Sequence, residues 1–483
     1  MPCPDVLPAV LGLAGPRFVL GHYLPDGPDS PGGITPFASG PRTDGNSDAA
    51  IRGPQARAAY GVTGAGVRIG IMSDSFNLLG GMAADIANGD LPAGVTILKE
   101  GPSGSHDEGR AMADLVHRIA PDAKLYFYTA TASEADFATG ITALQNAGCN
   151  IIVDDVAYLD EPFFQDGNAV QVAVENAIAK GVSYFTAASN VGTNYIQQSF
   201  KGVAATYPGL PAKATVQNFA ASGAAQTYAS VSIPTGGQIQ LDLQWDQPFA
   251  SIGKGHSSAN SLGLALYSLS GQLLAAASVN CTGGNPVQTL TYKNSTGSTS
   301  FRLVVWQNGG SAPPGQFKII NYGSGTLTGS GAGQGSGSVI GHELVPGANT
   351  VGAVAWSSTK AFGGSNAIEP FSSVGMGTIL YDSNGNRLAT PISSSKVNFT
   401  APDGSLTSVF APFYGTSAAA PNAAAVAALV LQADPDLTPA QVTSVLAQTA
   451  SASGGGASAI GAGLLQADSA VQMALSMLRG SGH

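Results

Sequence analysis

The alternation of short apolar strand patterns with amphipathic helix patterns is the feature that most restricts the fold of this chain. Strand and helix patterns follow one another at 67–72, 107–119, 123–129, 134–147, 150–156, 169–180 and 183–187. Strands separated by helices of this length pair in parallel, and a parallel sheet buries both of its faces under helices. The sequence therefore predicts an α/β fold with three layers, α/β/α.

The pattern changes between residues 214 and 325. Helical periods vanish there, and short alternating strands separated by polar turns replace them. Strands at this spacing predict an all-β sandwich. A Gly/Ser-rich linker follows at 326–335, and the α/β pattern then resumes. We therefore expect the sandwich to be an insert that splits one α/β domain into two halves, at 46–213 and 336–480. Residues 1–45 are rich in Pro and Gly and are expected to form an extended arm.

The composition excludes some classes of partner. Charged residues make up 10% of the 483 residues and the net charge is −10, whereas nucleic acids and anionic membranes bind basic patches. No apolar run has the length of a membrane span, and residues 8–20 lack the basic start of a signal peptide. Three cysteines are too few for a disulfide framework, although a Cys149–Cys281 bridge is left open.

The segment with the clearest chemical meaning is Gly-Thr-Ser-Ala-Ala-Ala-Pro at 415–421, directly before a long apolar helix pattern. A serine at a helix start presents its hydroxyl beside free backbone N–H groups. This arrangement suits a nucleophile whose attack creates an oxyanion nearby. The alternative is an ordinary Ser/Thr helix cap.

Asn190 closes a second informative segment. It follows an apolar strand pattern in Ala-Ala-Ser-Asn-Val-Gly at 187–192. A side-chain amide at the end of a strand can donate a hydrogen bond to a developing oxyanion. The alternative is an asparagine in a turn, where this residue tolerates left-handed backbone.

Together, these two segments resemble the serine and oxyanion motifs of the subtilisin-like serine peptidases, with Ser189 where the family carries glycine. The resemblance implies a subtilisin-like parallel-sheet catalytic domain interrupted by the sandwich. It also implies that Ser417 is the nucleophile, that Asn190 donates to the oxyanion, and that Gly415 and Asp155 line the substrate cleft. Substrates would be proteins or peptides and the protein would be secreted. No cofactor would be required for chemistry, and structural calcium is left open.

The catalytic histidine of the subtilisins has no counterpart, because His-Gly occurs nowhere in the chain. Alignment on Gly109 and on Ala120-Pro121 places Glu108 at that position. Glutamate there is the mark of the sedolisins, the serine-carboxyl peptidases, which activate serine with a Glu–Asp pair. Their aspartate lies one helical turn after the glutamate, where this chain has Met112. The second acid is therefore expected from elsewhere.

Asp74 is the first choice for that second acid, because it ends an apolar strand pattern as the subtilisin aspartate does. Alignment without gaps places Ser73 at the family position, so Asp74 is one residue late and needs an early strand end to face the site. Asp154 and Asp155, which follow Ile-Ile-Val in the strand pattern at 150–156, are the alternatives. These two acids could instead pair with Arg110 or hold a cation.

Two other interpretations concern the base. Ser105 and Glu108 have the S-x-x-E spacing of a capping box, in which glutamate only closes a helix start. His106 could serve as a displaced histidine base.

The sequence as a whole predicts a serine endopeptidase with Ser417 as nucleophile, Glu108 as base, Asp74 as orienting acid and Asn190 as oxyanion donor. A carboxylate base favours an acidic optimum. The rival hypothesis is a catalytically degenerate relative that acts as a binding or adhesion module. None of the candidate residues lies in the predicted sandwich, so we expect the insert to be dispensable for the chemistry.

Overall fold

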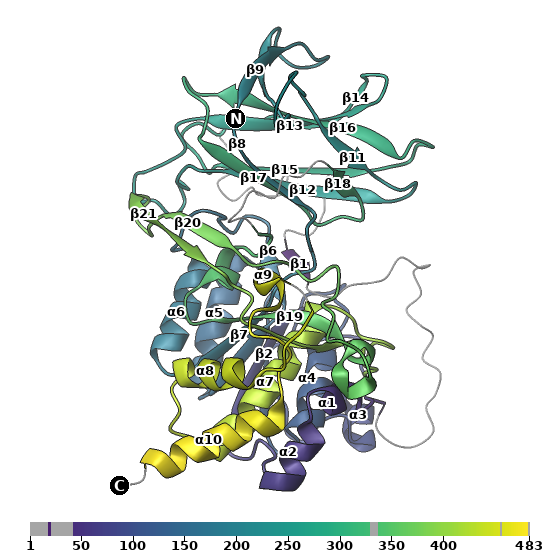
Figure 1. Cartoon of the computed structure of the whole chain (residues 1–483), viewed down its shortest axis with the longest axis vertical. Helices are drawn as coiled ribbons and strands as arrows, with labels where there is room; N and C mark the ends of the chain where they lie inside the picture. The colour runs from purple at the N-terminus through teal and green to yellow at the C-terminus, as the bar shows by residue number, and fades with distance from the viewer. Residues whose placement is uncertain (1–17, 21–41, 329–336, 455, 482–483) are drawn as a thin grey trace.

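The computed structural model describes residues 18–20, 42–328, 337–454 and 456–481. Figure 1 shows two parts. The lower part is an α/β domain, which contains the first helices after residue 42 and the last helix, α10. A separate pair of antiparallel sheets lies above it. The chain leaves the α/β domain after β7, builds the antiparallel sheets and returns before β19.

The α/β domain is built on a seven-stranded sheet in which all neighbours are parallel. In sheet order the strands are β22 (Phe399–Asp403), β19 (Asn349–Ala355), β7 (Ser183–Ala187), β5 (Ile151–Asp154), β2 (Arg68–Ser73), β4 (Lys124–Thr129) and β3 (Thr96–Lys99). Most of their residues are buried, as expected for strands covered on both faces. The predicted α/β fold is confirmed.

Helices cover both faces of this sheet. On one face, α4 (Glu108–Ile119) and α7 (Thr416–Ala433) share an apolar core with Ile71 and Val153. On the other face, α5 (Glu134–Asn146) and α6 (Ala169–Ala179) pack on Met72 and Ile152. The remaining helices are α1 (Asn46–Ala50), α2 (Gly53–Tyr60), α3 (Met82–Asn88), α8 (Pro439–Thr449), α9 (Ala457–Ile460) and α10 (Ala467–Ser481), with short 3-10 turns η1 (Gly341–Leu344), η2 (Trp356–Ser358) and η3 (Lys360–Phe362).

The central helix α7 is almost entirely enclosed. By length and composition it could cross a membrane, but 94% of its apolar window is buried inside the protein. Its small side chains, mostly alanine, let it lie against β5, β7, β19 and β22. The helix is therefore a core element whose first residues are held in place by the whole sheet.

The insert consists of two antiparallel sheets that enclose a second apolar core. One sheet contains β8 (Tyr195–Ser199), β12 (Gln238–Trp245), β15 (Val287–Lys293) and β17 (Gln316–Asn321). The other contains β9 (Gly202–Ala205), β10 (Ala214–Gln217), β11 (Ala229–Ser232), β13 (Ser261–Ser268), β14 (Leu273–Ala277), β16 (Ser300–Gly309) and β18 (Thr326–Thr328).

The observed borders of the insert differ from the predicted ones. Strands β8 and β9 lie before residue 214, where we expected the insert to begin, because their Gln- and Ala-rich sequences carry little apolar alternation. Strand β18 occupies the first three positions of the predicted 326–335 linker, and the remaining linker positions lie outside the described residues. Cys149 is a free buried thiol, so the Cys149–Cys281 bridge does not form.

Two small sheets connect the parts. A hairpin of β20 (Gly377–Tyr381) and β21 (Arg387–Ser394) reaches the insert, where the Tyr381 hydroxyl donates to the Asp246 carbonyl at 2.7 Å. Within the predicted N-terminal arm, the described strand β1 (Phe18–Leu20) pairs antiparallel with β6 (Val156–Tyr158), as Figure 1 shows.

Candidate active site

Ser417 is the second residue of α7, at the edge of the sheet where the parallel strands end. Gly415 caps the helix with φ 110°, a left-handed value that favours glycine. Its N–H donates to Oδ2 of Asp403 at 2.8 Å, at the end of β22. Burial raises the pKa of Asp403 to about 8, the Gly415 N–H lowers it and the charge of Glu369 raises it. This anchored turn fixes the direction of the Ser417 side chain, which is fully buried.

Asp155 lies between Ser417 and the acidic side chain of Glu108. It directly follows β5, is buried, and interacts with the carboxyl group of Glu108 and with the hydroxyls of Ser417 and Ser73. Burial raises the pKa of Asp155 well above its usual value. The charge of Glu108 and the close approach of its carboxyl group raise the pKa of Asp155 further, while the two hydroxyls lower it. Two buried acids in contact titrate as a pair that shares one proton.

The Ser417 hydroxyl lies close to Asp155 without completing a well-aligned hydrogen bond to any described residue. Loose contacts of this kind are common in peptidase sites before substrate binds. The arrangement therefore combines an available nucleophile with a protonatable pair.

Glu108 is the first residue of α4 and is fully buried. The capping-box interpretation is wrong, because Asp107 is the N-cap and the Ser105 hydroxyl donates to the Pro102 carbonyl instead. Met112, one turn later, is buried in the apolar core. Because Met112 stands where the sedolisins carry their aspartate, the acid that partners Glu108 has to come from another element, and it is Asp155 after β5.

Asp74 has a different immediate task from the one we expected. It directly follows β2, and its carboxylate accepts the backbone N–H groups of Ser75, His106 and Glu108, the last at 2.8 Å. Asp74 thus closes the start of α4 and holds Glu108 in place. Burial raises the pKa of Asp74 to about 6, the charge of Glu108 raises it too, and the three N–H donors lower it.

The one-residue offset noted in the sequence has a simple structural consequence. β2 ends at Ser73, and it is the Ser73 side chain, at the family position, that interacts with Asp155. Asp74 is consequently available for the N-terminus of α4. Asp155, assigned to the cleft by resemblance, is the acid that contacts both Glu108 and the serine.

His106 remains at the surface. Its side chain is 69% exposed, and Nδ1 lies 3.8 Å from Oδ2 of Asp74. It lies in the segment before α4, whereas Glu108 is buried beside Asp155. This arrangement favours Glu108 over His106 as the group that partners Asp155.

Asn190 lies beside the start of α7. Its side-chain oxygen accepts hydrogen bonds from the backbone N–H of Thr416 at 3.0 Å and from the Thr416 hydroxyl at 2.9 Å. These two bonds fix the plane of the amide next to the nucleophile. The position fits an oxyanion donor, because the amide of Asn190 lies next to the start of α7 and its NH₂ group is a hydrogen-bond donor.

Sequence reasoning missed a buried histidine behind the site. His342, in η1, contacts Asp154 and Glu161 through its two ring nitrogens. Side chains at adjacent strand positions face opposite sides, so Asp154 faces His342 while Asp155 faces the serine. The proposed pairing with Arg110 is wrong, since Arg110 binds Asp85 and Asp107. A His-Glu pair inside the apolar run 339–345 was the available signal.

In the described parts of the chain, no group of three or more His, Cys, Asp and Glu side chains is arranged to hold a metal ion. The acids around the site contact other groups of the protein. Asp74 accepts backbone N–H groups, Asp155 contacts Glu108 and two hydroxyls, and Asp154 contacts His342. Structural calcium elsewhere in the protein stays a prediction.

The insert contacts the segments that lead into the site. Gln244 of β12 donates to the Glu161 carbonyl at 2.9 Å and accepts the Phe163 N–H at 2.8 Å. Lys318 of β17 donates to the Gly337 carbonyl at 2.8 Å, shortly before η1. These contacts join the insert to the chain around β6 and η1, and the dispensability of the insert for the chemistry stays a prediction.

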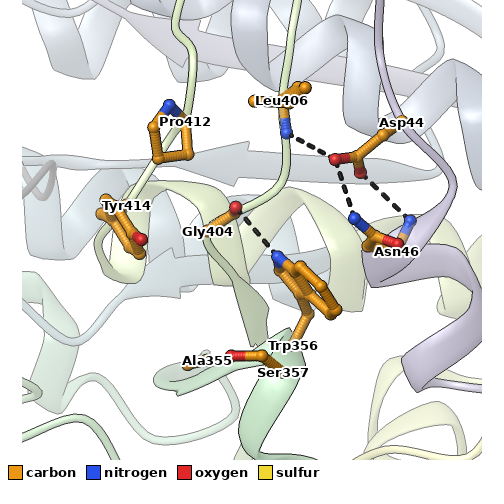
Figure 2. A pocket seen from close by; sticks show the side chains of 9 residues that line it. All are labelled: Asp44, Asn46, Ala355, Trp356, Ser357, Gly404, Leu406, Pro412 and Tyr414. Carbon is orange, nitrogen blue, oxygen red and sulfur yellow. Dashed lines mark hydrogen bonds between the residues drawn. The ribbon is translucent and has the colours of Figure 1, made fainter. Parts of the chain in front are cut away.

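A pocket of 360 Å³ lies just before the serine turn, as Figure 2 shows. Trp356 and Tyr414 give it aromatic walls, and the Trp356 indole N–H donates to the Gly404 carbonyl at 3.0 Å. Asp44 accepts the Leu406 N–H at 3.2 Å on the opposite side. The pocket is therefore a partly apolar recess, and its lining residue Tyr414 lies three residues before Ser417 in the chain.

Comparisons with known proteins bear on the family and the fold. The model of the subtilase family matches residues 82–463, which is more than half of the chain. The CspB protease of Clostridium perfringens has a similar fold, with a TM-score of 0.54 and 13% identity over 90% of this chain and 98% of that chain. A lanthipeptide protease is similar at a TM-score of 0.43 and 14% identity, over 90% of this chain and 99% of that chain. No curated protein sequence matches.

The matched residues include most of both halves of the α/β domain, without β2, and the segments that carry Glu108, Asp155, Asn190 and Ser417. The seven-stranded parallel sheet is the framework that brings those segments to one edge. The chain belongs to the subtilase family of serine peptidases.

Proposed function

We propose that this subtilase is an endopeptidase that activates Ser417 with a pair of carboxyl groups in place of histidine. The contact of Asp155 with both Glu108 and Ser417 carries the proposal. Oγ of Ser417 attacks the peptide carbonyl and its proton passes to Asp155, which gives its own proton to the ionised Glu108 as the final base. The reverse transfer protonates the leaving amine, and water hydrolyses the acyl-enzyme by the same route.

Asp155 keeps this pair in a useful protonation state. Its raised pKa favours a form in which Asp155 holds the shared proton and hydrogen-bonds to an ionised Glu108. A second proton at low pH would disable the base, and loss of the shared proton would place two charges side by side. The proposal therefore includes an optimum on the acid side of neutrality.

Negative charge develops on the carbonyl oxygen during attack. Two groups are suited to stabilise this charge by donating hydrogen bonds to the oxygen: the Asn190 amide and the backbone N–H of Ser417 at the start of α7. The hydrogen bonds from Thr416 orient the amide beforehand, so little reorganisation is needed in the transition state.

The β1–β6 pairing supports an extended peptide as substrate. Phe18, Val19 and Leu20 pair with Tyr158, Ala157 and Val156, immediately after Asp155. This edge thus accepts an extended backbone by strand addition, the mode by which many proteins bind peptides. We infer that substrate occupies the same edge and that the pocket in Figure 2 receives one of its apolar side chains. We also propose an exported protein, on composition alone.

A fluorophosphonate probe tests the proposal directly. Wild-type protein should be labelled on Ser417 and should hydrolyse a denatured protein, whereas Ser417→Ala should lose both properties and keep its thermal melt within a few degrees. An unlabelled wild-type protein, or turnover that persists in Ser417→Ala, would favour the binding-module hypothesis.

A further inference from the structure

The short turn η1 lies behind two separate segments of the site. Its His342 contacts Asp154, the residue before Asp155. Its Glu343 contacts Ser189, the residue before Asn190. One turn of four residues therefore touches the neighbours of both the acid partner and the candidate oxyanion donor.

His342 is held on both sides by acids. Nδ1 lies 2.8 Å from Oε2 of Glu161, and Nε2 lies 3.2 Å from Oδ1 of Asp154. Oδ1 of Asp154 also accepts the Thr186 hydroxyl of β7 at 3.0 Å. The Phe137 ring of α5 packs edge-on against the imidazole at 5.4 Å between ring centres. The histidine, Asp154 and Thr186 are thereby fixed relative to one another.

The surroundings of His342 favour the protonated imidazole. Burial alone lowers the pKa of His342, but the charges of Glu161 and Asp154 and their hydrogen bonds raise it well above its usual value. The other titratable groups near this cluster are Glu134 of α5, Glu343 of η1, Tyr158 of β6, Tyr184 of β7 and Asp160.

Stability does not account for such a cluster. Burying a charged imidazole between two carboxylates costs desolvation energy that well-packed apolar side chains would avoid. A buried ion cluster does, however, hold its members in a single geometry. The cluster includes Asp154, the residue before Asp155, so a fixed geometry of the cluster would also fix the position of Asp155.

Glu343 acts on the second segment. Ser189 has φ 63°, a left-handed value that is unfavourable for a residue with a side chain. Its hydroxyl donates to Oε1 of Glu343, whose Oε2 accepts the Ile340 N–H at 3.0 Å. The serine that replaces the family's glycine is thus tied to η1, one residue before Asn190.

We propose that η1 is a clamp, in which His342 positions Asp155 and Glu343 positions Asn190. The proposal rests on the peptidase mechanism above and adds two positioning residues to it. Neither residue touches substrate. Both act by fixing a neighbour of a residue that does.

The first test replaces the charged histidine. His342→Gln keeps a polar side chain but removes the cation, and should lower kcat per labelled serine by about 10- to 100-fold with KM changed by less than about threefold. The acid limb of kcat should move to higher pH, because a nearby cation favours ionised carboxylates. His117→Gln is the matched control, since His117 lies about 13 Å along α4 from Glu108.

Fluorophosphonate titration counts competent sites and separates the clamp from a purely structural role. A structural role would reduce the number of labelled sites and leave the rate and pH profile per site unchanged. His342→Gln with wild-type kcat per site and an unshifted acid limb would overturn the role of His342.

Ser189→Gly provides a variant that should fold even if His342→Gln does not, because glycine accepts the left-handed backbone. It removes the tie to Glu343 and should lower kcat by about three- to tenfold at unchanged KM. An unchanged kcat would overturn the Glu343 half of the clamp. An inactive, unlabelled wild-type protein would instead overturn the peptidase proposal and the clamp together.

Discussion

The carboxyl groups of Glu108 and Asp155 are in contact beside Ser417, although one begins α4 and the other follows β5. The strand order explains this contact, because β5 and β2 are neighbours and the segment after β2 holds the start of α4. The acid pair is therefore assembled by the sheet. In the sedolisin pattern the same pair lies on one helix, whereas here the corresponding helix position is Met112.

Replacement of the two aspartates should separate their tasks. Asp155→Asn should lower kcat/KM by at least about 100-fold and leave the melt nearly unchanged, because the shared proton is lost while the shape is kept. Asp74→Asn should mainly lower the melting temperature, since Asp74 accepts three backbone N–H groups. Kinetics per labelled serine and thermal melts of both variants measure this. The opposite ranking would return the orienting role to Asp74.

The pH dependence of kcat/KM should be bell-shaped with its maximum below neutrality. The pair works with one proton, so a second proton abolishes activity on the acid side and ionisation of Asp155 abolishes it on the alkaline side. Glu108→Gln should remove the activity, and His106→Ala should retain it within about threefold because His106 is exposed. An alkaline plateau that is lost only in His106→Ala would assign the base role to His106.

Removal of residues 1–41 should lower KM for a peptide substrate without changing kcat. The described part of that segment, β1, pairs with the β6 edge that we assign to substrate. A tethered strand at that edge competes with substrate by its effective concentration. Initial rates with and without the segment measure the effect. An unchanged KM would show that substrate binds elsewhere.

The folded protein should be more stable at pH 4 than at pH 7. Burial raises the pKa of Asp74 to about 6 and those of Glu134 and Glu343 to about 8, from usual values of 3.8, 4.5 and 4.5. A group with a raised folded pKa contributes stability below its unfolded pKa, and that stability is lost as pH rises through the folded pKa. For Asp74 alone the loss is about 3 kcal/mol.

Chemical unfolding at pH 4, 5.5 and 7 measures this dependence. Burial lowers the pKa values of Lys318 and Lys396 to about 7, so their contribution changes mainly above pH 7 and leaves this window nearly unaffected. The pKa of His117 is lowered by burial, so the contribution of this residue to stability rises with pH and opposes the predicted trend. Stability that rises steadily from pH 4 to pH 7 would contradict the prediction.

The sequence by itself determined the alternating α/β domain, the serine turn at Gly415 and the presence of Glu108 at the helix start. Each of these depends on residues that are close together in the chain. Apolar periodicity defines an element, and a glycine with left-handed φ defines a turn. Local patterns of this kind do not depend on how distant segments are arranged.

The tertiary structure decided which acid partners Glu108 and which residues support the site. Asp74 and Asp155 both follow apolar strands, and only strand order and the residue at which each strand ends determine which one faces the serine. A shift of one residue turns a strand side chain to the other face of the sheet. His342 reaches Asp154 after the chain has passed through the whole insert. Such contacts depend on the packing of segments far apart in the chain, and no local pattern specifies them.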